Sequence, residues 1–355
     1  MSVAANFSIE YIQHLGADGR LIGEALPDWV ESPQHLVELY RQMLFTRSFD
    51  SKAVALQRTG KLGTYASCLG HEAAHIGVAS AMHVDDVLAV SYREIGAMLL
   101  RGVQPREILM YWGGDERGSQ FEQAVNDLPI CVPIATQCLL AAGSALAFKL
   151  RQEPRVAVAF VGDGGSSKTD FYAALNSAGA YSLPLVLVVV NNQWAISVPR
   201  SAQTGAQTLA QKGIAGGLEC VQVDGNDLLA VREVAEHAIK RARNGHGGTV
   251  IEAITYRLSD HTTADDARRY RDEAEVKAAW EKEPMLRIRR YLIEHEVWSE
   301  SAEAEWKQEC NQRIDKEVNA YLELAPPPAT DMFDYLYAEL PEDLRAQRAE
   351  VEAMR

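Results

Sequence analysis

The sequence has little of several features that mark common classes of protein. No run of apolar residues approaches the roughly 18 that a membrane-spanning helix needs, and the beginning of the chain has neither the basic segment nor the apolar stretch of a signal peptide. We therefore expect no membrane partner. The 35 Lys and Arg residues are outnumbered by 49 Asp and Glu, giving a formal net charge of -14. This balance argues against a nucleic-acid partner, because neutralising phosphates requires a basic surface.

Cysteine is also scarce. The five cysteines are odd in number, scattered and without a CxxC pair: Cys68, Cys131, Cys138, Cys220 and Cys310. This usage predicts reduced thiols and a cytoplasmic location. The remaining composition, 47% hydrophobic and 24% charged, is that of an ordinary globular protein.

Strand and helix patterns alternate through the middle of the chain. Apolar runs predict strands at 85–90, 156–161, 185–190, 220–223 and 249–257, with amphipathic helices between them and a further helix over 206–215. This alternation predicts an α/β fold, a doubly wound parallel sheet with helices on both faces. We divide the chain into a hairpin-like N-terminal arm (1–34), a central α/β domain (35–272), a helical C-terminal region (273–325) and a C-terminal interface segment (326–355).

Two turns in this central domain carry the strongest functional signal. Val161-Gly-Asp-Gly-Gly165 ends one predicted strand, and Asn191-Asn192 follows the next, with 26 residues (165–190) between the GDG and NN motifs. Both turns fall at the carboxyl edge of a parallel sheet, where α/β proteins bind ligands. Asp163 offers a carboxylate and Asn192 an amide oxygen, which suit Mg²⁺. The neighbouring helix start favours anions, and backbone can approach a diphosphate closely at Gly162, Gly164 and Gly165.

A second motif in the sequence is typical of a zinc site. His71-Glu72-Ala73-Ala74-His75 satisfies HExxH, in which two histidines one turn apart bind zinc beside a general base, and Glu94 downstream has a spacing that could supply a third ligand. The alternation of strands and helices is wrong for a zinc hydrolase of that kind, because there the motif helix faces an antiparallel edge. We expect His71 near the entrance of the site and His75 packed within the helix.

From about residue 35 to 340, the chain resembles the α subunit of two-subunit 2-oxo acid dehydrogenases of the pyruvate and branched-chain types. These subunits form the thiamine diphosphate-dependent decarboxylating component. Five segments carry the resemblance in the family's order: 60–73, containing Gly60-Lys-Leu-Gly-Thr-Tyr65 and Gly70-His-Glu-Ala73; Ser91-Tyr-Arg-Glu94; Cys131-Val-Pro-Ile-Ala-Thr-Gln137; the GDG and NN turns; and Tyr256 to Asp266. The resemblance implies that residues 35–272 form the diphosphate-side cofactor domain.

The resemblance also implies roles for individual residues. Mg²⁺ would be bound by Asp163, the Asn192 side chain and the Trp194 backbone carbonyl; many relatives have tyrosine in place of this tryptophan, which a main-chain ligand tolerates. Other positions match cofactor contacts: Tyr92, Arg93, Gly162, Gly164 and Gly165 toward the diphosphate, and the backbones of Val132 and Ile134 toward the aminopyrimidine ring. Val190 also matches a cofactor-contact position. In branched-chain relatives a structural potassium ion is held at the positions of Cys131, Pro133, Thr136 and Gln137, so a potassium site stays an open alternative.

His261 is the catalytic candidate. It lies in a polar loop, 259–271, that is poor in apolar anchors. The alternative interpretation is that His261 is an ordinary solvated histidine without a catalytic role. By resemblance it would donate to the diphosphate or to a substrate carboxylate, and a histidine changes charge near physiological pH.

The activity implied by the resemblance is oxidative decarboxylation of a 2-oxo acid, with transfer of the acyl group to the lipoyl group of a dihydrolipoyl acyltransferase. We favour pyruvate; branched-chain 2-oxo acids and a catalytically silent cofactor-binding scaffold are the alternatives. The carboxylate that tunes the pyrimidine ring is not recognisable in this sequence, and in the family it comes from a β subunit. We therefore expect an α₂β₂ heterotetramer that is incomplete without β.

Overall fold

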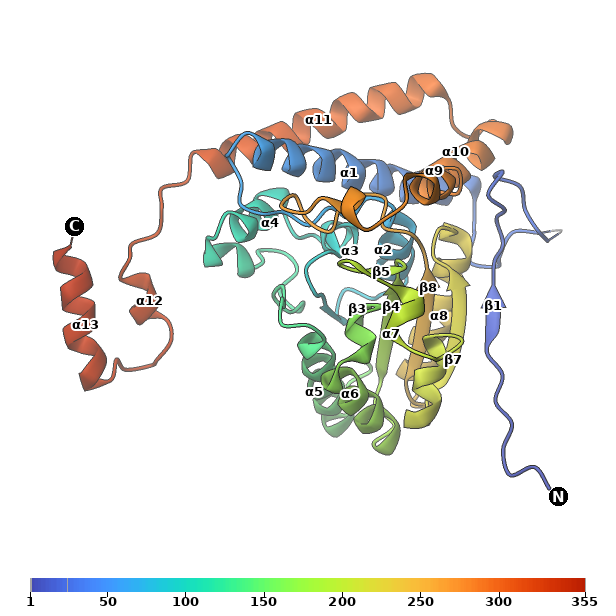
Figure 1. Ribbon diagram of the computed structural model, residues 1–355, viewed down its shortest axis with the longest axis horizontal. Coiled ribbons are helices and arrows are strands. Elements are labelled where there is room, and N and C mark those ends of the chain that lie inside the picture. The colour runs from blue at the N-terminus through green and yellow to red at the C-terminus, as the bar shows by residue number, and fades with distance from the viewer. Residues whose placement is uncertain (1, 24, 355) are drawn as a thin grey trace.

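A parallel sheet forms the centre of the computed structural model, which describes residues 2–23 and 25–354 (Figure 1). Its six strands lie in the order β1-β7-β8-β4-β3-β2, and every neighbouring pair is parallel. A separate antiparallel hairpin, β5-β6, follows β4. The strands are β1 (Glu10–Ile12), β2 (Val87–Ala89), β3 (Ala157–Gly162), β4 (Leu185–Asn191), β5 (Trp194–Ala195), β6 (Val198–Pro199), β7 (Glu219–Asp224) and β8 (Thr249–Ile254). The predicted α/β class with a parallel sheet is confirmed.

Helices cover both faces of this sheet. One face carries α1 (Pro33–Arg58), α2 (Glu72–Ala79), α3 (Ile95–Leu100), α4 (Pro105–Trp112) and α8 (Leu228–Arg243). The other carries α5 (Thr136–Arg151) and α6 (Thr169–Ala180). The remaining short elements are α7 (Arg200–Gln203) and the 3-10 helices η1 (Glu116–Ser119), η2 (Gly165–Ser167), η3 (Ala210–Gly216) and η4 (Ala267–Arg269). The helix predicted over 206–215 is thus a 3-10 helix that begins later.

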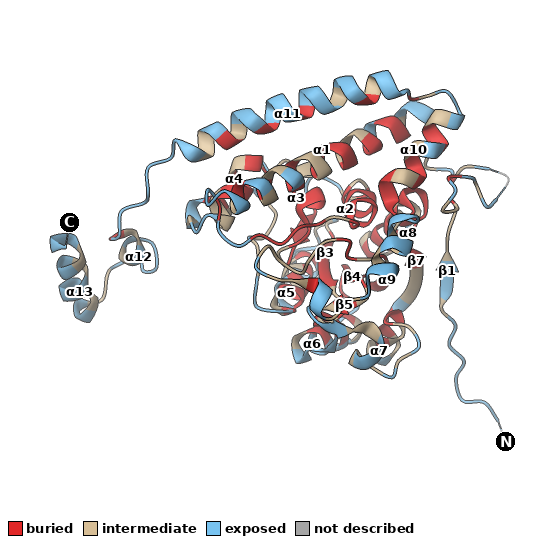
Figure 2. Ribbon diagram, turned by 45° about the horizontal axis from the view of Figure 1, so that its top comes forward, coloured by how far each residue is buried: buried red, intermediate tan, exposed pale blue. Residues whose placement is uncertain are grey.

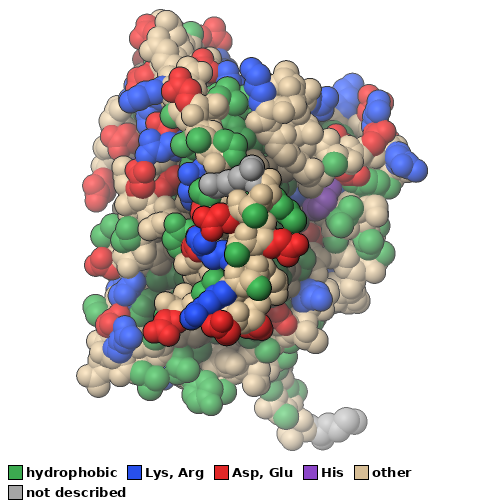
Figure 3. Space-filling view, turned by 90° about the vertical axis from the view of Figure 1, so that its left-hand side faces the viewer, with side chains coloured by type: hydrophobic (Ala, Val, Ile, Leu, Met, Phe, Trp, Pro, Cys, Tyr) green, Lys and Arg blue, Asp and Glu red, His purple; other side chains and the backbone are tan. Residues whose placement is uncertain are grey.

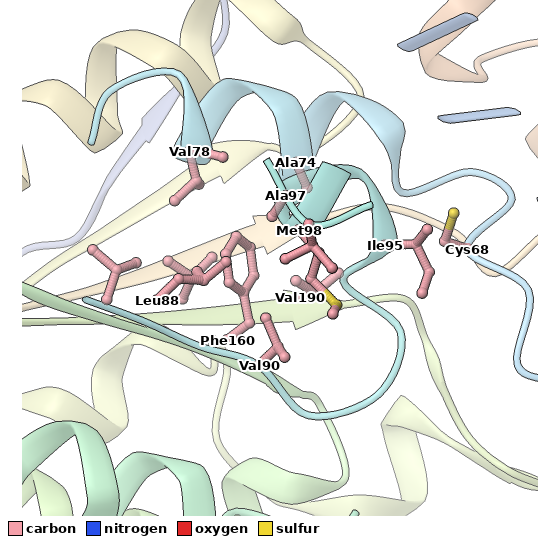
Figure 4. Close-up of a cluster of buried hydrophobic side chains, with 14 of the residues drawn as sticks. Cys68, Ala74, Val78, Leu88, Val90, Ile95, Ala97, Met98, Phe160 and Val190 are labelled. Carbon is pink, nitrogen blue, oxygen red and sulfur yellow. The ribbon is translucent and has the colours of Figure 1, made fainter. Parts of the chain in front are cut away.

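The two cores follow from the two-residue period of the strands. In β3, Val158 and Phe160 contribute to the core beneath α2 and α8, whereas Ala159 contributes to the core beneath α5 and α6. Figure 4 shows Phe160 beside Val90 and Val190, on the same side of the sheet as Val78 of α2. Because both faces are buried, these strands are almost continuously apolar, as their sequence predicts.

The N-terminal arm differs from the hairpin expected for it. Leu15 and Leu21 do form an antiparallel bridge, but Glu10–Ile12 joins the main sheet as the edge strand β1, parallel to β7. Leu15 is fully buried in a third cluster with residues of α1 and of α10 (Pro284–Glu294). A three-residue strand has too short a pattern to reveal its partner.

The C-terminal region is helical, as predicted, and ends in a projecting segment. After α9 (Glu273–Trp280) and α10, the helix α11 (Glu300–Leu322) packs along α1 (Figures 1 and 2). Beyond it, α12 (Asp331–Asp334) and α13 (Glu342–Ala353) extend away from the body and bury no residue. Figure 3, which views this side, shows charged side chains of both signs over the projection with hydrophobic ones between them. None of the described helices is long and apolar enough to cross a membrane.

Candidate active site

A cavity of about 830 Å³ lies at the carboxyl edge of the sheet. Its walls come from the segments that follow β2, β3 and β4, and from the loop that follows β8. Every residue proposed for the site from the sequence lines this cavity: Tyr92, Arg93, Val132, Ile134, Gly162, Asp163, Gly164, Gly165, Val190, Asn192, Trp194 and His261. Segments separated by up to about half the chain are therefore brought to one place.

Oxygen atoms gather at the end of the cavity formed by β3 and β4. Asp163 is buried, and its burial raises the pKa of the carboxyl group, while the Gln203 amide, 2.8 Å from Oδ2, opposes that rise. The buried Asn192 side chain accepts a hydrogen bond through Oδ1 from the Trp194 amide at 3.2 Å. A carboxylate, an amide oxygen and a nearby backbone carbonyl are hard ligands that fit Mg²⁺.

The segment after Asn192 has an unusual backbone. Gln193 has φ of 73° and Ile196 has φ of 55°, in the left-handed region that β-branched side chains strongly avoid. The Trp194 side chain between them donates to Glu275 of α9 at 3.3 Å and packs against Tyr270, so it is tied to other elements of the fold. The Trp194 carbonyl accepts instead from Arg257 at 3.3 Å. Strain of this kind persists only where surrounding contacts enforce it.

Two buried arginines lie beside this end of the cavity. Arg93 donates to the carbonyls of Ser67 and His261, and Arg257 donates to the Ile196 carbonyl at 2.9 Å and to the Tyr270 hydroxyl at 2.9 Å. Among the described residues, neither arginine forms an ion pair with a carboxylate. A buried guanidinium without a counter-charge is costly, so this pair favours the binding of an anion such as a phosphate.

His261 lies between these two arginines. Its Nδ1 is 3.1 Å from Nη2 of Arg93 and 3.4 Å from Nη1 of Arg257. Burial, Arg93 and Arg257 together lower the pKa of His261 to about 4. The structure therefore does not favour the charge change near physiological pH that the sequence led us to expect, because burial, and then the two guanidiniums, disfavour imidazolium. A neutral His261 whose Nδ1 accepts from arginine presents Nε2–H as a donor.

The three glycines of the GDGG turn differ in their surroundings. A Cβ at Gly162 would meet no atom within 4 Å, so its absence widens the cavity. A Cβ at Gly164 would lie 2.6 Å from that of Ala195, and one at Gly165 would lie 2.6 Å from Cγ2 of Val161. Close packing within the protein thus explains Gly164 and Gly165, while Gly162 leaves room for a ligand.

The opposite wall comes from the segment before α5. Val132 and Ile134 line the cavity and are 47% and 41% exposed, so this wall also reaches the surface. Of the positions considered for potassium, Thr136 donates to Asp170 at 3.0 Å, and Gln137 has a buried Oε1 with no partner in the described structure. That amide oxygen is available to a cation.

The HExxH motif does not form a metal site. Glu72 is buried and pairs with Arg47 at 2.8 Å, while its second oxygen accepts from the Gly70 amide. His75 is fully buried against Phe160, and His71 lines the cavity, as expected. No group of three or more His, Cys, Asp or Glu residues in the described parts of the chain is arranged to hold a metal ion. The hydrolase alternative fails because its general base is engaged in a structural ion pair.

Arg257 was not singled out from the sequence. It follows the end of β8 by three residues, a position at the carboxyl edge that would have marked it as a candidate. Its full burial depends on contacts with the β5-β6 hairpin and with the loop 259–271, which the sequence does not reveal.

A parallel α/β fold with buried arginines and clustered oxygen ligands at its carboxyl edge is suited to an anionic ligand and a divalent cation. Residues 40–327 match the family model described as dehydrogenase E1 component. The chain belongs to this family, which implies thiamine diphosphate as the cofactor.

Curated relatives are similar over nearly their whole length. The chain is 39% identical over 345 residues to the 3-methyl-2-oxobutanoate dehydrogenase subunit alpha of Mycobacterium tuberculosis, covering 97% of this chain and 94% of the relative. It is 38% identical over 337 residues to the pyruvate dehydrogenase E1 component subunit alpha of Acholeplasma laidlawii, covering 94% and 97%. The corresponding subunit of Staphylococcus epidermidis is 38% identical over 341 residues, covering 95% and 91%.

Proposed function

We propose that this chain is the α subunit of a thiamine diphosphate-dependent 2-oxo acid dehydrogenase that oxidatively decarboxylates pyruvate. One observation carries the proposal: a single cavity combines the Asp163 and Asn192 oxygens with the guanidinium of Arg93, which forms no ion pair with any described residue, and with His261, whose Nδ1 accepts from Arg93. A metal ion requires the oxygen ligands, a diphosphate requires the nitrogen donors, and a metal–diphosphate pair requires both side by side. A silent scaffold would have no need for a half-buried histidine held in one tautomer beside them.

Mg²⁺ would be held by Asp163, the Asn192 side chain and the Trp194 carbonyl, and the diphosphate by Tyr92, Arg93 and the GDGG turn. Bound thiamine diphosphate supplies a nucleophilic carbon and an electron sink for decarboxylation. The protein contributes position and charge: Arg93 neutralises phosphate, and Nε2–H of His261 donates to the diphosphate or to the substrate carboxylate. Oε1 of Gln137, which has no partner among the described residues, supports a potassium ion in the neighbouring wall.

The substrate preference follows from sequence similarity rather than from the shape of the cavity. Relatives named for pyruvate and for 3-methyl-2-oxobutanoate have nearly the same identity, 38% and 39%. The segments 111–117 and 192–197 resemble the pyruvate type more closely, so pyruvate is our first choice and the branched-chain acid the second. One or two methylenes change binding by only ~1–3 kcal/mol.

The cavity is open on a side rimmed by apolar residues. Val132 and Ile134 line the cavity and are exposed, and Leu139 and Leu140 are exposed on the helix α5 that follows them. We propose that a β subunit covers this face in an α₂β₂ heterotetramer and completes the site with the carboxylate for the pyrimidine ring. The acyl group then passes to the dihydrolipoyl acyltransferase of a multienzyme complex. All five thiols are free, which agrees with a reducing cytoplasm.

The proposal is tested with the α chain co-expressed with its β subunit. Steady-state kcat/KM is measured for pyruvate and for 3-methyl-2-oxobutanoate with an artificial electron acceptor. We expect pyruvate to be favoured by about tenfold or more. A preference for the branched acid would reassign the substrate, and turnover of neither would contradict the activity itself.

A further inference from the structure

Gln203 lies behind the proposed metal ligands rather than on the cavity wall. It is the last residue of α7, directly after the β5-β6 hairpin, and it does not line the cavity. Its Nε2 is 2.8 Å from Oδ2 of Asp163 and 3.3 Å from the Val198 carbonyl. Both neighbouring oxygens can only accept, so the orientation of the amide is fixed by its surroundings.

The other end of this amide has no partner. Oε1 of Gln203 is buried and accepts no hydrogen bond from the described residues. It lies near the GDGG turn, since a Cβ added at Gly164 would come within 3.8 Å of it. Buried amide oxygens are nearly always paired, with protein or with ordered water. A water bound to a cation at Asp163 is a donor of the required kind.

We infer that Gln203 is a positioning residue of the metal site, an inference that rests on the proposed role of Asp163 as the metal ligand. Its amide group holds one carboxylate oxygen of Asp163 and offers Oε1 to a water ligand of the bound ion. Fixing the carboxylate before the ion arrives lowers the ordering cost of binding. Groups that orient metal ligands in this way typically change metal affinity by 10- to 100-fold when removed.

A purely structural role is the rival explanation. Gln203 also contacts the hairpin through Val198, so its loss could distort β5-β6 and the strained segment near Ile196. A distorted cavity would bind the cofactor poorly at any metal concentration and would lower the stability of the protein. A misoriented Asp163 would weaken metal binding alone, and excess metal would correct it.

The test uses the α–β complex with Gln203→Met, which has similar length without the amide. Its matched control is Gln207→Met, at an exposed glutamine nearby whose side chain makes no hydrogen bond with the described residues. The apparent affinities for Mg²⁺ and for thiamine diphosphate are measured from the quenching of tryptophan fluorescence. Melting temperatures are measured without metal or cofactor.

For Gln203→Met we expect Mg²⁺ affinity to fall by about tenfold, with a melting temperature like that of the control. Thiamine diphosphate affinity should fall at limiting Mg²⁺ and return to within about twofold of wild type at saturating Mg²⁺. Unchanged Mg²⁺ affinity, or a loss that saturating Mg²⁺ does not restore, would overturn the inference. The variant Asp163→Asn distinguishes a failure of the inference about Gln203 from a failure of the proposed metal site. If Asp163→Asn also binds Mg²⁺ normally, the proposed metal site itself is wrong.

Discussion

Nη2 of Arg93 lies 2.8 Å from the backbone carbonyl of His261 and 3.1 Å from its Nδ1. Because arginine can only donate, Nδ1 must accept, and the proton of the neutral ring is on Nε2. One side chain therefore anchors the loop 259–271 and sets the tautomer of its histidine. The same guanidinium is the strongest candidate for the diphosphate, so cofactor binding and the orientation of His261 are coupled.

Replacing His261 with alanine removes the Nε2–H donor. We expect kcat for the favoured 2-oxo acid to fall by on the order of 100-fold, the usual contribution of a positioned proton donor, while the complex with β stays assembled. His237→Ala, at an exposed position on α8, is the control. Steady-state kinetics at saturating cofactor measure the effect, and wild-type kcat in His261→Ala would remove this residue from the chemistry.

Replacing Asp163 with alanine removes the only charged protein ligand proposed for Mg²⁺ and leaves the negative charge of the diphosphate less compensated. We expect calorimetric titration of the α–β complex to show cofactor affinity weakened by about 100-fold or more. Asp85→Ala, at an exposed aspartate, should bind normally. Equal affinity in the two variants would place the metal elsewhere.

His75 makes the fold sensitive to acid. Both ring nitrogens are buried without a partner in the described structure, and burial lowers the pKa of this histidine to about 3 from 6.5. The unfolded chain therefore binds the proton more readily, so the cost to stability is absent above pH 6.5 and grows as the pH falls toward 3. At pH 5 this single group costs ~2 kcal/mol.

His75→Leu should flatten the pH dependence of the free energy of unfolding between pH 7 and 5, measured by urea denaturation of the α chain. A change in packing alone would shift the free energy of unfolding equally at both pH values. The slope of this free energy against pH therefore distinguishes the loss of the histidine charge from a change in packing. His237→Leu should keep the wild-type slope. If His75→Leu keeps it too, another group, such as the buried His71, causes the acid sensitivity.

Truncation after Ala329 removes α12 and α13, which bury no residue of their own. Met332, Tyr335, Leu336 and Tyr337 are all exposed on this segment, which makes it suited to contact another subunit. We expect sedimentation to show weakened assembly with β, while the melting temperature of the α chain alone is unchanged. A lower melting temperature with intact assembly would mean that the segment stabilises its own subunit instead.

The parallel sheet and most of the site could be predicted because their signals are local. Continuous apolar strands end in the GDG and NN turns, and the carboxyl ends of parallel strands meet at one edge. The pKa of His261 and the burial of Arg257 could not be predicted, since both depend on residues brought together by long-range packing. The contacts that hold the loop 259–271 could not be predicted either, for the same reason.

That loop is poor in apolar anchors. In the structure it is fixed by polar contacts to distant segments, including the Thr263 amide to the Tyr65 carbonyl at 2.8 Å and Arg93 to the His261 carbonyl. The partners in these two contacts lie 198 and 168 residues apart along the chain, and a local pattern carries no information about them. The close packing around Gly164 and Gly165, a second reason for glycine at these positions, could not be predicted for the same reason.

The central claim is that this chain holds the diphosphate half of a shared site. Of the carboxylates that line the cavity, Asp163 is assigned to the metal, Asp170 accepts from Thr136, and Glu94 accepts from the Ser91 and Arg93 amides. The most direct test measures decarboxylation by the purified α chain with saturating Mg²⁺, thiamine diphosphate and pyruvate, before and after addition of β. We expect no turnover before addition and restored turnover after it. Robust turnover by an α chain shown by mass spectrometry to be free of β would contradict the claim and would point to Glu94 as the missing carboxylate.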